Sequence, residues 1–139
     1  MTPLANFFIP GEIMVQRLQE VLPSLRVRRV QDYAQAQREV SGSVPEVLVR
    51  LLRATVADSA GDTALLEQQY TAFYAVPGSF EDWDRDGPVL AQIVQALTGY
   101  EPDDAGIGAF TPVGSMVPQT WEQQGVVVYP VSFSVPVRL

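Results

Sequence analysis

Three aspartates at alternate positions are the residues of this sequence whose spacing most resembles a chemical site. The stretch "SFEDWDRDGPVLAQIV", residues 79–94, places Asp82, Asp84 and Asp86 before a glycine. This D-x-D-x-D-G spacing is the first half of a calcium-binding loop, in which alternate side-chain oxygens converge on one cation. The twelfth position of such a loop carries a bidentate acid, but here it is Ile93. The loop therefore lacks its strongest ligand.

Helix capping accounts for the same acids. A helix predicted over residues 88–98 would begin at Pro88, which suits the first turn of a helix. Asp86 or Gly87 would then cap the unpaired N–H groups at its start. The other two aspartates would add negative charge near the positive end of the helix dipole. We favour this interpretation over a metal site and expect no cofactor.

Composition removes most other enzyme chemistries. The chain has no cysteine and no histidine, and all nine of its basic residues are arginine. Thiolate and imidazole ligands, an imidazole base and a Schiff-base lysine are therefore missing. Carboxylates remain, and Asp103 and Asp104 stand side by side in "EPDDAG". A turn explains this pair better than catalysis, although a carboxylate-dependent hydrolase stays an alternative.

Length and charge suggest one acidic globular domain over residues 1–139. The chain is 47% apolar and carries a net charge of −7. The charge is uneven, because residues 1–56 sum to +2 and residues 57–139 to −9. An acidic surface repels phosphate, so specific nucleic-acid binding is not expected. No apolar run approaches the ~20 residues that span a bilayer, so no membrane contact is expected either.

Hydrophobic periodicity predicts an α+β fold. The expected fold is a small mixed or antiparallel sheet of about four to five strands with two main helices packed on it. The predicted elements are a helix at 13–22, a strand at 25–30, a hairpin of strands 46–57 and 64–76 around a turn at 58–62, a helix at 88–98, a short strand in "AFTPV", and a strand at 126–137. Apart from that short strand, residues 100–125 are predicted to form loops.

The last predicted strand has one clearly apolar face. Its odd-numbered residues from 127 to 137 are all Val, Tyr or Phe, which predicts that this face lies on the core. Pro130 and Pro136 share the other face and cannot donate hydrogen bonds to a neighbouring strand. We therefore predict that this strand lies at a sheet edge or beside a bulge.

Several arginines and aromatic residues are candidates for contacts between subunits. A buried arginine needs a partner, so Arg50 and Arg53, which interrupt an apolar strand, are expected to meet Glu67 or an acid of another copy. The basic cluster in "LRVRRV" could meet acids in the same way or simply be solvated. The candidate interface residues are Arg26, Arg28, Arg29, Arg50, Arg53, Trp83, Trp121 and Pro130.

The C-terminal half resembles a known family. The words "LAQIVQALTGYEP", "AFTPVGS" and "TWEQQGVVVYPVSFSVPV" are similar to those of the tail terminator proteins of Mu-like, contractile-tailed phages and prophages. The N-terminal half matches more loosely, through a first helix in "IMVQRLQEVLPSLRVRRV" and a hairpin formed by "EVLVRLLRATVA" and "EQQYTAFYAV". The specific words cover only part of the chain, whereas the order of elements matches over most of it.

This resemblance implies a structural protein without turnover. Such proteins have an α+β fold and form a hexameric ring on the last ring of tail-tube subunits. The ring ends tube and sheath polymerisation and offers a surface to the head-completion or neck protein. DNA passes through the lumen without specific binding. The implied location is the neck end of the virion tail, assembled in the bacterial cytoplasm. Alternatives are another head-to-tail joining or tail completion protein, or a calcium-binding module.

Overall fold

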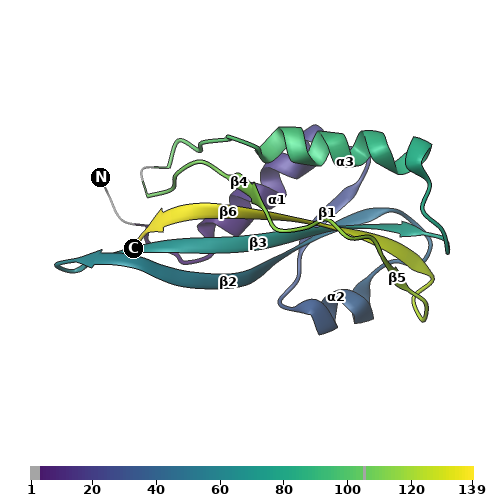
Figure 1. The fold of residues 1–139 in the computed structure, drawn as a ribbon, viewed down its shortest axis with the longest axis horizontal. Coiled ribbons are helices and arrows are strands. Elements are labelled where there is room, and N and C mark those ends of the chain that lie inside the picture. Colours follow the sequence, from purple (N-terminus) through teal and green to yellow (C-terminus); the bar gives the residue numbers. More distant parts are fainter. Residues whose placement is uncertain (1–3, 105) are drawn as a thin grey trace.

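A twisted sheet with helices on both faces organises the chain (Figure 1). The computed structural model describes residues 4–104 and 106–139. Along the chain the elements are α1 (Ile9–Val21), β1 (Arg26–Arg29), α2 (Tyr33–Glu39), β2 (Glu46–Ala60), β3 (Thr63–Pro77), α3 (Trp83–Leu97), β4 (Thr111–Val113), β5 (Gln119–Trp121) and β6 (Val126–Arg138). None of the helices in these residues has the length and apolar character required to cross a membrane.

The sheet is mixed, which is one of the two arrangements predicted. Its strands follow the order β1-β2-β3-β6-β4, and β5 pairs with β6 beside β4. β1 runs parallel to β2, whereas the other pairs are antiparallel. The α+β class is therefore confirmed. The described residues hold six strands rather than four to five, because the region predicted as loop contains β5 as well as the expected short strand β4.

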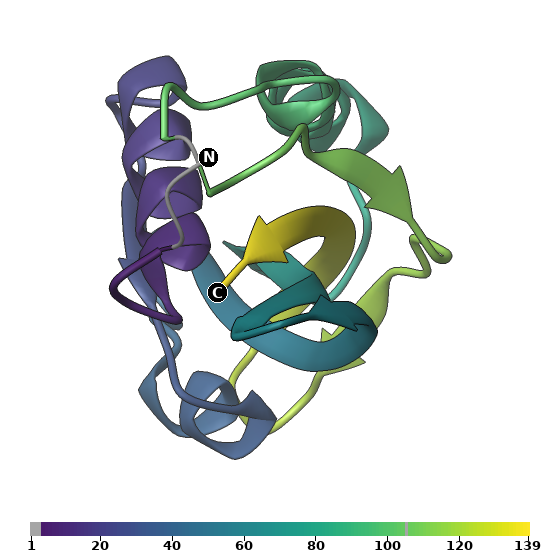
Figure 2. The same ribbon diagram turned by 90° about the vertical axis from the view of Figure 1, so that its left-hand side faces the viewer.

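The main core lies between the sheet and the two long helices. α1 and α3 cover the same face of the sheet, side by side (Figure 2). Met14 and Leu18 of α1 and Ile93 and Leu97 of α3 are fully buried there. The odd-numbered residues of β6 from 127 to 137 face these helices, as the alternating pattern predicted. Burial of this face provides the main hydrophobic stabilisation.

A second core lies on the opposite face, beneath α2. Leu48, Phe73 and Val128 pack there with Trp121, whose ring lies 5.9 Å from that of Phe73. Trp121 was predicted as an interface residue, but only 4% of it is accessible, so its role is in the core of the subunit. The sequence pattern of β6 suggested a single core face, but at this end of the sheet both faces are covered.

β6 is an inner strand, which corrects its predicted place at an edge. β3 pairs with it along one side, from Leu65↔Arg138 to Pro77↔Val126. On the other side β5 pairs with residues 126–128 and β4 with residues 132–134. Pro130 falls between these two short strands, where no ladder hydrogen bond is required of it. Pro130 is thus tolerated because the strand has a gap between its two outer partners, not because it lies at an open edge.

Both long helices begin earlier than periodicity predicted. α1 starts at Ile9, so Gly11 is inside the helix rather than before it, with Pro10 in the first turn. A Cβ at Gly11 would lie 2.7 Å from Cε1 of Tyr70, and this glycine therefore lets α1 approach the sheet closely. The predicted end of α3 is confirmed, because Gly99 follows the helix with φ +73°.

Candidate interaction surfaces

The three aspartates of the opening motif do not converge. Asp82 is the N-cap of α3, and its carboxylate accepts a hydrogen bond from the Arg85 N–H at 3.1 Å. Asp84 is exposed in the first turn, and Asp86 points into the protein. Capping is therefore the role of the loop, but the helix starts at Trp83 and not at Pro88, and the cap is Asp82. In residues 4–104 and 106–139, no group of three or more acids is placed to hold a metal ion.

Asp86 is the centre of a buried polar cluster. Its carboxylate accepts hydrogen bonds from the Tyr129 hydroxyl at 2.6 Å and from two nitrogens of Arg85 at 2.7 and 3.0 Å. Burial alone would raise the pKa of Asp86, but the hydrogen bonds from Arg85 and Tyr129 outweigh it and lower this pKa. Burial and the neighbouring carboxylate raise the pKa of Tyr129. The cluster therefore holds the start of α3 on β6.

An apolar groove runs along the outer side of α3. It has a volume of about 560 Å³ and lies between the helix and the segment 116–118 that precedes β5. It is lined by Glu81, Trp83, Leu90, Ala91, Val94, Gln95, Met116, Pro118 and Tyr129. Trp83 is 81% exposed and Phe80 84% exposed, and Met116 and Val117 are also exposed. Large apolar side chains gathered at one place on a surface typically mark a contact site. We call the groove formed by the lining residues named above the α3 groove.

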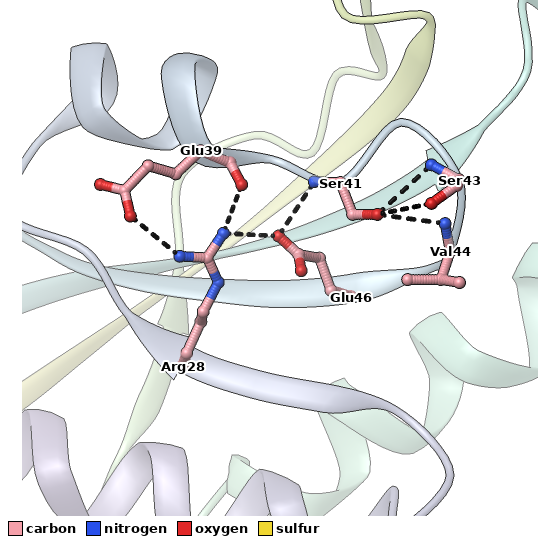
Figure 3. Close-up of polar contacts among 6 residues, drawn as sticks. All are labelled: Arg28, Glu39, Ser41, Ser43, Val44 and Glu46. Carbon is pink, nitrogen blue, oxygen red and sulfur yellow. Dashed lines mark hydrogen bonds and ion pairs between the residues drawn. The ribbon is translucent and has the colours of Figure 1, made fainter.

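Arg28 belongs to the fold rather than to a free basic patch (Figure 3). Its Nη2 donates to Oε1 of Glu46 at 3.0 Å and to the carbonyl of Glu39 at 2.6 Å. Glu46 is fully buried, and its Oε1 also accepts from the Ser41 N–H at 3.4 Å. This ion pair links β1, β2 and the segment after α2. The interpretation of Arg28 as an intersubunit residue is therefore replaced by a role inside the subunit.

Arg26 and Arg29 of the same cluster stay at the surface. Both are exposed at opposite ends of β1. Arg29 pairs with Glu12 of α1 at 3.4 Å, and both side chains are more than half exposed. A pair of this kind contributes little stability. Arg26 and Arg29 therefore remain available to a partner.

Arg50 and Arg53 do not meet Glu67. Glu67 lies opposite Thr55 and accepts a hydrogen bond from Ser134 at 2.5 Å. The expected buried pair was wrong because Arg53 is exposed and Arg50 is only half-buried, so water can solvate both guanidinium groups. Within the described part of the chain, neither arginine forms an ion pair.

A bulge in β2, where Leu52 is an extra residue that shifts the register between Leu51 and Arg53, places both arginines on one face of the sheet. Arg50 lies opposite Thr71 and Arg53 opposite Gln69, two residues that share a face of β3. Without the extra residue the arginines would point to opposite faces, because side chains alternate along a regular strand.

The outer half of β2 projects from the globule as an arm. β1 pairs only with residues 46–49, so in the described chain no strand pairs with the outer edge of β2 from Arg50 onward. Residues 52–59 are all exposed, and they include the large apolar side chains of Leu52 and Val56. Figure 1 shows this end of the hairpin reaching beyond the helices. We call residues 50–60 the β2 arm.

The adjacent acids Asp103 and Asp104 line a shallow depression with Glu20 and Arg17. Both aspartates are exposed, and Arg17 instead lies over the ring of Tyr100, 4.6 Å from its centroid. The depression gathers acids at the surface without burying any of them. It offers none of the desolvation that tunes a catalytic carboxylate.

Comparison with known proteins finds similarity in fold alone. No protein-family model matches the sequence, and no curated protein matches it significantly. Among solved structures, 26 chains match significantly. One of them is a chain of the "Virion of native gene transfer agent (GTA) particle", with a TM-score of 0.61 and 12% sequence identity. The match covers 91% of this chain and 92% of that chain. The two chains share their fold over nearly their whole lengths.

The sequence indicated one wall of the α3 groove but not the other. The aromatics around the acidic loop suggested a contact site, and Trp83 is indeed exposed. The second wall of the groove, at 116–118, comes from the loop between two three-residue strands that periodicity cannot detect. The two exposed methionine and valine side chains in "SMVP" were the available signal for it.

Proposed function

We propose that this protein is a structural subunit of a phage-like virion, and specifically the tail terminator. The observation that supports the virion role is the match in fold over 91% of the chain to a component of a gene transfer agent particle. The C-terminal sequence words support the terminator role, which rests on resemblance. In this role the chain assembles and binds, and it catalyses no reaction.

The proposed assembly is a hexameric ring on the end of the tail tube. A ring closes through head-to-tail contacts, so each subunit needs two different and complementary surfaces. The elongated shape of the subunit, with the β2 arm at one end and the start of α3 at the other, is consistent with such contacts (Figure 1). The proposed partners are the tube protein, the sheath protein where one exists, and the head-completion or neck protein, with DNA passing through the lumen.

Loss of the protein from particle-producing cells tests this function. If it is a terminator, tubes of abnormal length without attached heads are expected in electron micrographs. Tubes of normal length without heads would instead indicate a head-to-tail joining protein. Intact particles of normal length would refute a virion role. Labelled protein in wild-type particles should be found at the head-proximal end of the tail.

A further inference from the structure

The α3 groove and the β2 arm have complementary surface chemistry. Trp83 stands in the groove mouth between the exposed carboxylates of Asp82 and Asp84, and its indole N–H donates to Glu81 at 3.2 Å. Arg85, which follows these acids in the sequence, already pairs with Asp86. The groove is therefore apolar within and negative at its start.

The β2 arm is positive at its base and carries the exposed apolar side chain of Val56 farther out, before Asp58 near its tip. Arg50 and Arg53 share one face, and Val56 lies on the other, because it pairs with Leu66 across the hairpin. Leu52 stands at the bulge between the two arginines. Unpaired backbone groups along the outer edge of the arm add hydrogen-bonding capacity to these side chains.

The β2 arm and the α3 groove have similar lengths. From Arg50 to Val56 the arm extends about 20 Å at the rise of a β-strand. From Trp83 to Gln95 the groove follows α3 for about 18 Å at the rise of a helix. The hairpin tip and the start of α3 lie at opposite ends of the long axis of the molecule (Figure 1). A subunit therefore presents the arm in one direction and the groove mouth in the other.

We infer that the β2 arm of one copy occupies the α3 groove of the next copy. The apolar residues of the arm cover Trp83 and Met116, and Arg50 and Arg53 meet the acids at the groove mouth. The contact is head-to-tail, because the two surfaces differ. Apolar burial supplies most of the affinity, and the charges set orientation and encounter rate. This contact rests on the proposed ring and specifies how its subunits join.

Cysteine cross-linking tests the contact directly, because the chain has no cysteine of its own. Val56→Cys protein is mixed with Met116→Cys protein at high concentration and oxidised. We expect a disulfide-linked heterodimer on a non-reducing gel. The matched control replaces the first variant with Val44→Cys, a similarly exposed valine outside the arm. Equal yields from the two mixtures, or no cross-linking from either, would overturn the inference.

Charge exchange provides a second measurement. Arg53→Glu and Asp84→Arg are each introduced into the cross-linking variants, and circular dichroism confirms that each remains folded. Each change alone should reduce the heterodimer yield at least threefold, and the two together on opposite partners should restore it. Unchanged yields would overturn the inference.

Electron microscopy separates this inference from the proposed function. Particles that carry Arg53→Glu should lack rings at the tube end. Rings of normal form in that variant would refute the arm-and-groove contact but leave the terminator role standing. Wild-type protein absent from tails would refute both.

Discussion

Replacing Arg28 with methionine should reveal the cost of an unpaired charge inside this sheet. The change Arg28→Met keeps most of the aliphatic length but removes the guanidinium from Glu46. That carboxylate is fully buried, its Oε1 keeps only the 3.4 Å hydrogen bond from Ser41, and its Oε2 has no partner in the described structure. Breaking a buried pair in this way typically costs about 3–5 kcal/mol.

The expected loss for Arg28→Met is at the lower end of that range. The Arg28 side chain is 18% exposed, so some water can reach the gap that it leaves. We therefore expect a loss of about 3 kcal/mol in the free energy of unfolding. For a domain of this size that corresponds to a melting temperature lower by roughly 10 °C. Urea titration followed by the fluorescence of buried Trp121 measures the change.

Two further variants separate the pair from its surroundings. Glu39→Gln removes the other ion-pair partner of Arg28, which is 43% exposed, and should cost no more than about 0.5 kcal/mol. Arg28→Met combined with Glu46→Met removes both charges and should recover most of the stability. If Arg28→Met loses no more than Glu39→Gln, the reasoning about the buried carboxylate is wrong.

Three further predictions concern the packing and titration of the fold. Gly11→Ala should lower the free energy of unfolding by about 1–3 kcal/mol, because the new methyl group meets Tyr70. The control Gly87→Ala on α3 meets nothing within 4 Å and should raise the free energy of unfolding by up to ~1 kcal/mol in the same urea titration. Asp86→Asn should lower the free energy of unfolding by about 1–3 kcal/mol at pH 7, whereas the exposed control Asp84→Asn should lower it by only a few tenths of a kcal/mol. Because the pKa of Asp86 is lowered, its contribution is present above its ordinary pKa of 3.8 and is lost as pH falls further, so wild type and variant should converge in acid. Burial raises the pKa of Tyr70 from 10.0 to about 12, so stability should fall as pH rises from 10 to 12. Tyr70→Phe should flatten that fall, and an equal slope would exclude this residue as its source.

The elements with a repeating apolar pattern were predictable. The spacing of Leu90, Ile93, Val94 and Leu97 specified the buried side of α3, and the alternation in β6 specified its main core face. The long hairpin was also predicted, although its strands extend to a turn shorter than expected. In each case the local period of the sequence matches the environment of every residue in the element.

Features that depend on partners distant in sequence were missed. β4 and β5 have three residues each and exist only because β6 offers them hydrogen bonds. The bulge at Leu52, which places Arg50 and Arg53 on one face, follows from the register with β3 and leaves no mark in the periodicity. Trp121 is buried because α2 folds beneath the sheet, and nothing in the tryptophan's own neighbourhood indicates this.

The inner place of β6 makes the whole domain depend on this one strand. This strand supplies the partner of β3, β4 and β5 and contributes residues to both cores. A nascent chain that lacks residues 126–138 leaves the apolar faces of the earlier elements uncovered. Loss of this one strand therefore removes both cores at once rather than a single layer of the sheet.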